Sequence, residues 1–241
     1  MKTAEPFPIT ESLGRALQLY AENFCPFLGI ASCSALAAVI CGVVQTLLDL
    51  PAWATMISGV LVVMIQIWGG LVLIRAIHAR SVGEEPDIRA LILETMTLLP
   101  AALPGALIFL VLVTGGFVLL IVPAIFFYTT LYFFIYVQAL ENKGLWASFF
   151  RSYALTMPVF WRVCAVHGTV MAGTLAVFIP VFFGMVILET PAIMKTVFLT
   201  ALGAVIAPVF TGFYLYLFEH CRRLNDGGVQ ISITTFPGPA E

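Results

Sequence analysis

The chain has 241 residues, of which 61% are hydrophobic and only 10% are charged. Soluble domains carry about 25% charged residues, so this composition excludes a soluble globular core. The formal net charge of -2 is uninformative by itself, because the side on which each cation lies matters more in a membrane protein than the sum.

Charged residues gather in short clusters that leave long uncharged runs. Asp, Glu, Lys and Arg are absent from residues 23–48, 50–74, 95–140, 163–188 and 196–218. A helix needs about 20 apolar residues to cross a hydrocarbon core of about 30 Å, so four runs hold one span each and the run 95–140 holds two. The pattern predicts an all-α polytopic membrane helical bundle with six transmembrane helices.

The six spans are expected within a single membrane domain of residues 1–224. Gly115, Gly116 and Pro123 are the strong helix breakers in the double-length run, so the turn between spans three and four should lie between them. Residues 225–241 are too short and too rich in Gly and Pro to fold alone, which predicts a flexible cytoplasmic tail. The approximate predicted spans are 26–48, 52–74, 98–116, 121–140, 161–186 and 194–218.

Amphipathic segments precede spans one, three and five, and we expect each to form an interfacial helix. In ITESLGRALQLYAENF, Leu13, Leu17 and Tyr20 recur at helical spacing while charged residues occupy the other side. Asp87 should cap the second segment. In the third segment the expected apolar face consists of Leu145, Trp146 and Phe149, and the expected polar face of Lys143, Ser148, Arg151 and Ser152.

The cations are distributed asymmetrically about this topology. Ten of the eleven Lys and Arg residues fall on one side of the six-span arrangement, and Lys195 falls on the other. By the positive-inside rule, this asymmetry predicts that both termini are cytoplasmic. No signal peptide is evident, because Glu5, Pro6, Pro8 and Glu11 interrupt any early apolar core.

The three amphipathic segments align with one another. A shift of 136 positions superposes Arg15 on Arg151, and a shift of 74 superposes Arg15 on Arg89. Two explanations are open: three copies of a unit made of an interfacial helix and a helical hairpin, or the general similarity of amphipathic helices that precede spans. Repeats are frequent in transporters, so the first explanation bears on function.

The sequence contains no recognisable catalytic motif. The H-E-x-x-H, G-x-S-x-G, Walker and dinucleotide-binding patterns do not occur, and the three histidines are scattered. The five cysteines include no C-x-x-C pair, so neither disulfides nor a zinc site is expected. We expect a protein without enzymatic activity, cofactor or bound metal.

Several polar side chains fall inside the predicted spans, where each is costly unless it has a partner. Interhelical hydrogen bonds are the ordinary explanation for the histidine and glutamines, and aromatic packing for the tyrosines. The alternatives are a proton relay at the histidine, a substrate site at the glutamines, and hydroxyls presented to a lipid headgroup or solute by the tyrosines. These intramembrane candidates are His167, Gln45, Gln66, Tyr128, Tyr132 and Tyr136.

Arginines cluster at the predicted cytoplasmic boundary, where the inner leaflet supplies anionic headgroups. Topology explains most of them, and lipid contact is the more specific hypothesis. The three arginines that coincide under the two shifts are expected at one depth. The candidate headgroup contacts are Arg15, Arg89, Arg151 and Arg162.

From Leu120 onward the sequence LIVPAIFFYTTLYFFIYVQALENKGLWASFFRSYALTMPVFWRV resembles the core of the YciC-like bacterial inner-membrane protein family. That family is related to the membrane domain of some glycerophosphodiester phosphodiesterases. The matching positions include the turn at Val122 and Pro123, then Arg162, and between them Ala147, Arg151, Ser152, Leu155 and Thr156. Ala124 stands where the family usually has Gly. The resemblance covers most of residues 7–223 and implies a six-span envelope protein of unsettled biochemical role.

The resulting hypothesis is a non-enzymatic integral inner-membrane protein that acts in envelope organisation or lipid interaction. Its expected partners are membrane lipids, with anionic headgroups at the arginines, and nucleic acid is not an expected partner. The alternative is a small transporter or permease for an unidentified solute or lipid. The sequence does not determine the oligomeric state.

Overall fold

The computed structural model describes residues 7–48 and 51–226, and the described chain is all-α, as predicted. The elements in chain order are α1 (Ile9–Glu22), α2 (Phe24–Leu48), α3 (Ala52–Ser81), α4 (Ile88–Met96), α5 (Leu99–Leu119), α6 (Ile121–Leu131), α7 (Phe134–Glu141), α8 (Leu145–Thr156), a 3-10 turn (Met157–Val159), α9 (Phe160–Ile187) and α10 (Ala192–Asp226).

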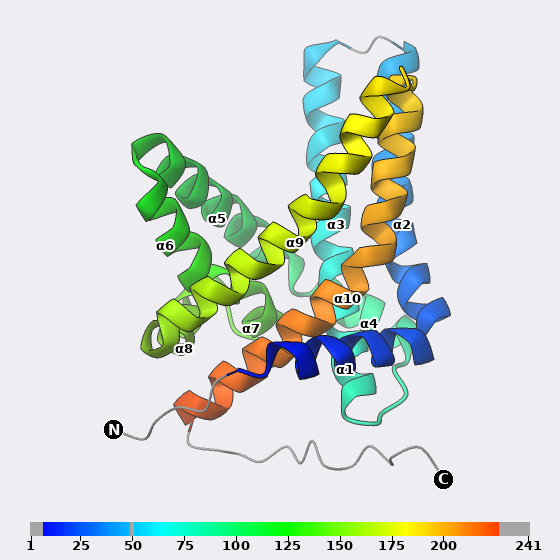
Figure 1. Ribbon diagram of the computed structural model, residues 1–241. Coiled ribbons are helices and arrows are strands. Elements are labelled where there is room, and N and C mark those ends of the chain that lie inside the picture. Colours follow the sequence, from blue (N-terminus) through cyan, green and yellow to red (C-terminus); the bar gives the residue numbers. More distant parts are fainter. Residues whose placement is uncertain (1–6, 49–50, 227–241) are drawn as a thin grey trace.

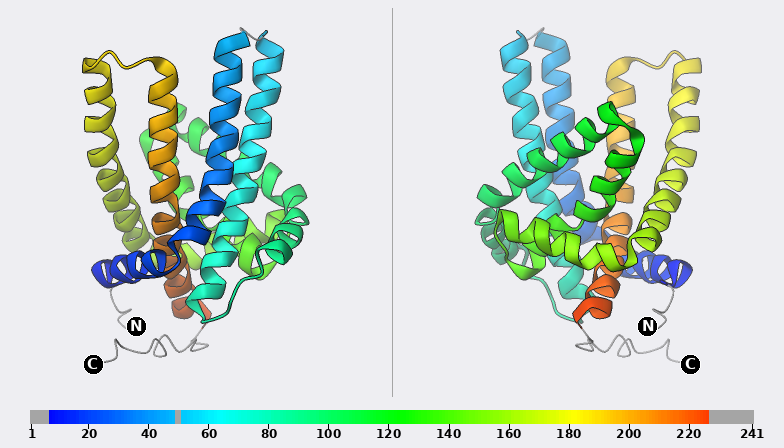
Figure 2. Two further views of the ribbon diagram at one scale, coloured as in Figure 1. Left: turned by 90° about the vertical axis from the view of Figure 1, so that its right-hand side faces the viewer. Right: turned by 90° about the vertical axis from the view of Figure 1, so that its left-hand side faces the viewer.

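Six stretches of the described chain are long and apolar enough to cross a membrane, so this is a multi-pass integral membrane protein. The pairs α2–α3, α5–α6 and α9–α10 form three helical hairpins whose connecting ends point the same way (Figure 1). Helices α1, α4, α7 and α8 lie at the opposite end (Figure 2). Each hairpin is therefore preceded by a helix at this end, which matches the predicted arrangement of interfacial helices and spans.

The helices extend further than the predicted spans at the end that the cation distribution assigns to the cytoplasm. Helix α3 continues to Ser81, beyond the predicted end at 74, and α10 continues to Asp226, beyond 218. Residues 225 and 226 of the predicted tail thus belong to a helix, and 227–241 lie outside the described residues. The outer turn at residues 49–53 also lies partly outside them.

The fourth predicted span is interrupted. Helix α6 ends at Leu131 and α7 begins at Phe134. The carbonyl of Thr130, next to this break, accepts hydrogen bonds from Ser152 Oγ at 2.8 Å and Thr156 Oγ1 at 3.2 Å. Side-chain donors from α8 thereby satisfy a backbone acceptor that has no water to bind in the packed bundle.

This role of α8 reverses part of its predicted orientation. Ser148 and Ser152, expected on the polar outer face, are fully buried, whereas Trp146 is 62% exposed and Phe150 is 73% exposed. The serines turn inward because backbone carbonyls there require donors, and the aromatic rings turn outward because the surroundings at this depth are lipid. Phe149 is buried, as expected.

The hydrophobic core lies in the end of the bundle that carries the short helices. Ala16 and Leu19 of α1 pack there with Ile77 of α3 and Leu215 of α10, and α1 crosses α10 in Figure 1. Towards the connecting ends of the hairpins the large apolar side chains are exposed, for example Leu47. The outer halves of the hairpins therefore depend on lipid to cover their apolar surface.

The turn between α5 and α6 lies between the predicted breakers. Leu120 has extended backbone and joins the two helices. A Cβ placed on Gly116 would lie 2.7 Å from the backbone nitrogen of Ala124, whereas one on Gly115 would meet no atom within 4 Å. The close approach of α5 to α6 therefore requires glycine at 116 and not at 115.

Replacing Gly116 with Leu should force α5 and α6 apart and lower the free energy of unfolding by about 1–3 kcal/mol, the usual cost of overpacking. The matched change Gly115→Leu meets open space and should be close to neutral. Thermal unfolding of both variants in detergent measures the difference. Equal melting temperatures for the two variants would contradict the packing of this hairpin.

Candidate functional site

The two intramembrane glutamines connect α2 to α3. Gln45 Nε2 donates to Ser58 Oγ at 2.6 Å, and Gln66 Nε2 donates to the carbonyl of Ser34 at 3.2 Å. Both interactions are interhelical hydrogen bonds, the ordinary role of polar side chains in membrane helices. Gln66 also lines a small polar pocket, described below.

His167 of α9 lies in an aromatic cluster. Its ring centroid is 5.0 Å from that of Tyr128, 4.9 Å from that of Tyr132 and 5.1 Å from that of Tyr214. Tyr132 and Tyr136 are also in ring contact, so the predicted tyrosine ladder continues across the break between α6 and α7. The sequence analysis missed Tyr214, since nothing in the sequence showed which face of α10 meets this ladder.

The hydrogen bonding of His167 differs from the prediction. Nδ1 lies 2.9 Å from the carbonyl of Val163, one turn earlier in the same helix, instead of bonding to another helix. Nδ1 must therefore carry the proton, which leaves Nε2 as an acceptor. Nε2 is buried and has no hydrogen-bond partner within the described residues. Two interhelical hydrogen bonds lie in the cluster: the side chains of Tyr128 and Tyr214 bond to each other, and the Tyr136 hydroxyl donates to the carbonyl of Thr211 at 3.3 Å.

Glu141 is the centre of an ion-pair network at the end of the bundle with the short helices. Its carboxylate lies 2.7 Å from Lys143 Nζ, 3.4 Å from Arg151 Nε and 3.8 Å from Arg222 Nε, and its side chain is only 8% exposed. Arg151 also binds the carboxylate of Asp226. The network joins the ends of α7, α8 and α10.

Arg75 makes a second connection in the same layer. Its Nε donates to the carbonyl of Ala139 at 2.7 Å, and its Nη1 donates to Glu94 Oε2 at 2.7 Å. Its Nη2 donates to the side chain of Asn142, a residue in the left-handed region with φ of 50°. One planar guanidinium thus ties α3 to α4 and to the end of α7, a geometry for which Arg is better suited than Lys.

The four arginines proposed to contact headgroups fall into two groups. The Arg151 side chain is 20% exposed and held by two carboxylates, so the structure uses it to join helices. Arg15, Arg89 and Arg162 are exposed. Arg15 pairs with Glu11 on its own helix, and the guanidinium of Arg89 makes no ion pair with a described residue. Only this second group has side chains accessible to lipid.

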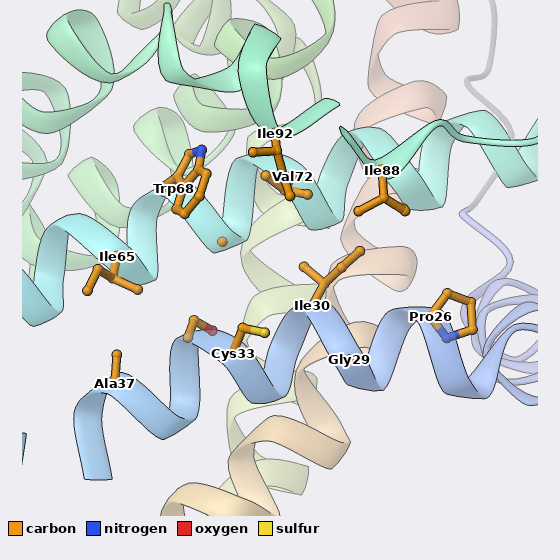
Figure 3. A pocket seen from close by; sticks show the side chains of 12 residues that line it. Pro26, Gly29, Ile30, Cys33, Ala37, Ile65, Trp68, Val72, Ile88 and Ile92 are labelled. Atoms are coloured by element: carbon orange, nitrogen blue, oxygen red, sulfur yellow. The ribbon is translucent and has the colours of Figure 1, made fainter. Parts of the chain in front are cut away.

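Two pockets flank the contact between α2 and α3. An apolar groove of about 560 Å³ opens between α2, α3 and α4 (Figure 3). A smaller pocket of about 290 Å³ lies between α2, α3 and α10, where Gln66, Thr200 and Thr211 contribute polar groups. The residues that line the groove are Pro26, Gly29, Ile30, Cys33, Ser34, Ala37, Ile65, Trp68, Gly69, Val72, Ile88 and Ile92.

Comparison with known proteins adds no assignment. No family model matches the chain, and neither a curated protein nor a solved structure matches it.

Replacing Arg151 with Gln should lower the free energy of unfolding by about 1–3 kcal/mol, because it removes charged hydrogen bonds to the buried Glu141 and to Asp226. Arg15→Gln removes an exposed i,i+4 pair and should cost less than about 0.5 kcal/mol. Thermal unfolding in detergent compares the two. A loss for Arg15→Gln as large as that for Arg151→Gln would show that this division of the arginines is wrong.

Proposed function

We propose that this integral membrane protein binds lipids of the cytoplasmic leaflet of the bacterial inner membrane through its interfacial helices, without enzymatic activity, and thereby acts in envelope organisation. The observation that carries the proposal is that the interfacial helices have apolar side chains on two faces. One face packs on the bundle and the other is exposed, and each of these helical segments also carries an exposed arginine side chain. A helix of this kind lies in the plane of the headgroup and acyl boundary.

Helix α1 illustrates the two faces. Ala16 and Leu19 are buried against the bundle, while Leu13 and Leu17 are exposed. Arg15 is two positions from each of them, hence on the opposite side of the helix, and its side chain is 41% exposed. Apolar side chains in the acyl region with a cation at headgroup level fit an anionic leaflet.

The junction between α8 and α9 repeats this combination. At this junction Trp161 is 80% exposed and Arg162 directly follows it. Tryptophan is enriched at membrane interfaces because its ring is apolar and its N–H is polar. An exposed tryptophan next to an arginine therefore favours a position at the headgroup level.

The cytoplasmic orientation of this end and membership of the YciC-like family are parts of the same proposal. The cation asymmetry supports the orientation, since nine of the ten Lys and Arg residues in the described part of the chain belong to the side with the short helices. The resemblance of residues 120–163 supports the family.

A small transporter is the second candidate, and the pocket of about 290 Å³ between α2, α3 and α10 favours it. Polar groups from Gln66, Thr200 and Thr211 inside a membrane bundle are a feature of solute sites. A thermal-shift screen of lipids and metabolites separates the candidates, because a ligand stabilises the protein that binds it. Stabilisation by a polar metabolite that is lost in Gln66→Leu would favour transport over lipid binding alone.

Replacing Arg15, Arg89 and Arg162 together with Gln should weaken retention of phosphatidylglycerol by purified protein. Each cation near an anionic surface contributes about 1 kcal/mol, so affinity should fall about fivefold for each charge removed. Native mass spectrometry after controlled delipidation counts the retained lipids. Thermal unfolding should remain close to wild type, because these three side chains are exposed.

Lys195→Gln is the matched control, since it removes a cation from the first turn of α10 at the other end of the bundle. It should leave phosphatidylglycerol retention unchanged. Equal retention by the wild type, the triple variant and the control would contradict lipid contact by the arginines.

A further inference from the structure

The groove between α2, α3 and α4 runs along the axes of α2 and α3 and starts at the end with the short helices. Figure 3 shows Pro26 and Ile88 at one end of the groove and Ala37 and Ile65 at the other. Pro26 is close to the beginning of α2 at Phe24, and Ala37 is near its middle. The groove thus extends from the cytoplasmic boundary to the centre of the hydrocarbon core.

The length of the groove matches one leaflet. Pro26 and Ala37 are 11 positions apart on α2, which corresponds to about 17 Å at a helical rise of 1.5 Å per residue. Half of a hydrocarbon core of about 30 Å is about 15 Å. An extended acyl chain anchored at the cytoplasmic headgroup level therefore spans the groove from end to end.

The shape of the groove is fixed by two contacts between the helices that form it. Its floor is a tight contact, because a Cβ on Gly69 of α3 would lie 3.0 Å from the Cβ of Ser34 on α2. Its wall is fixed at Trp68, whose indole Nε1 donates to Thr95 Oγ1 of α4 at 3.1 Å. The helices therefore cannot close the groove by moving together or by rotating the indole.

The chemistry of the lining selects an alkyl chain. The side chains of Ile30, Val72 and Ile92 that line the space in Figure 3 are aliphatic, and Ser34 turns its hydroxyl to the carbonyl of Ala31. A volume of about 560 Å³ is in the usual range for small-molecule sites. Such a lining offers dispersion contacts along its length and few hydrogen bonds.

A cation follows the lining residue at the mouth of the groove in the sequence. Arg89 is exposed on the first turn of α4, next to Ile88 of the lining, and its guanidinium makes no ion pair with a described residue. The neighbouring carboxylate of Asp87 accepts from the backbone N–H groups of Arg89 and Ala90, so it is occupied in capping α4. A phosphate at the mouth can therefore pair with Arg89.

We propose that this groove binds one acyl chain of a glycerophospholipid from the cytoplasmic leaflet, with the phosphate of that lipid at Arg89. The site rests on the lipid-binding function proposed above and gives it a specific location. It differs from the exposed faces of the interfacial helices, because the chain is enclosed by three helices and is retained when lipids around the protein are removed.

Filling the groove tests the proposal. Gly29 faces open space, since a Cβ there meets no atom within 4 Å, and Cys33 is exposed one turn later in the same groove. Gly29→Leu and Cys33→Phe should each abolish one phospholipid that the wild type retains after delipidation in detergent. Native mass spectrometry counts the lipids, and thermal unfolding confirms that each variant is folded.

Two variants outside the groove are matched controls. Gly173→Leu on α9 places the same side chain at a helical glycine with no atom within 4 Å, and Ala172→Phe places the larger side chain at an exposed position of the same helix. Both should retain the wild-type number of lipids. Arg89→Gln should reduce occupancy of the same lipid without abolishing it.

The outcomes separate this inference from the general function. If folded Gly29→Leu and Cys33→Phe retain as many phospholipids as the wild type, the groove is not the site, although lipid binding elsewhere stands. If the wild type retains no phospholipid, both the groove and the proposed lipid-binding function are wrong. Loss of one lipid in the groove variants and in neither control establishes the site.

Discussion

The structure depends on the exclusion of charge from the hydrocarbon core. Because an unpaired ion in lipid is costly, the charged side chains of the described chain lie near the ends of the helices, and at the end with the short helices most of them bind one another. Glu141 and Arg75 are the two centres of this layer: the first joins α7, α8 and α10, and the second joins α3, α4 and α7. Helices whose outer halves leave large apolar side chains exposed are thereby held together at one end.

The exclusion of charge from the hydrocarbon core explains why the helices pack around a hydrophobic core at one end of the bundle and expose apolar side chains at the other. The short helices lie in the same layer as the ion pairs and supply core residues such as Leu19 and Leu155. Beyond the layer the hairpins extend into lipid with large exposed apolar side chains, and the α2–α3 hairpin leaves a groove instead of a closed seam. In water these surfaces would cause aggregation, whereas in a bilayer they need no protein partner, and lipid becomes a structural component of the fold.

Hydropathy was sufficient to predict the helical class, the hairpins and the turn between Gly116 and Pro123, because span length is a direct consequence of bilayer thickness. It could not predict the break between α6 and α7. That break is stable only because Ser152 and Thr156, more than 20 residues later, reach the carbonyl of Thr130. The same distant contact explains why the polar face of α8 was assigned to the wrong side.

For the candidate site residues, too, the sequence did not predict the partners that the fold brings to them. Gln45 and Gln66 were recognisable as interhelical groups from their position in apolar runs, but their serine partners were not. Arg15, Arg89 and Arg151 are equivalent in sequence alignment, yet Arg151 meets two carboxylates that only the tertiary structure brings to it. The groove has no sequence signature at all, since small and aliphatic residues at helical spacing are also those of ordinary packed helices.

The central claim is that the charged layer is cytoplasmic and the hairpin turns lie on the opposite side. Single cysteines at Glu84 and Thr190, introduced into a chain whose native cysteines are replaced, test it through labelling of intact cells with a membrane-impermeant maleimide. The account predicts labelling at position 190 in intact cells and at position 84 only after permeabilisation. Labelling at position 84 alone in intact cells would invert the topology and remove the basis for contact with cytoplasmic lipid.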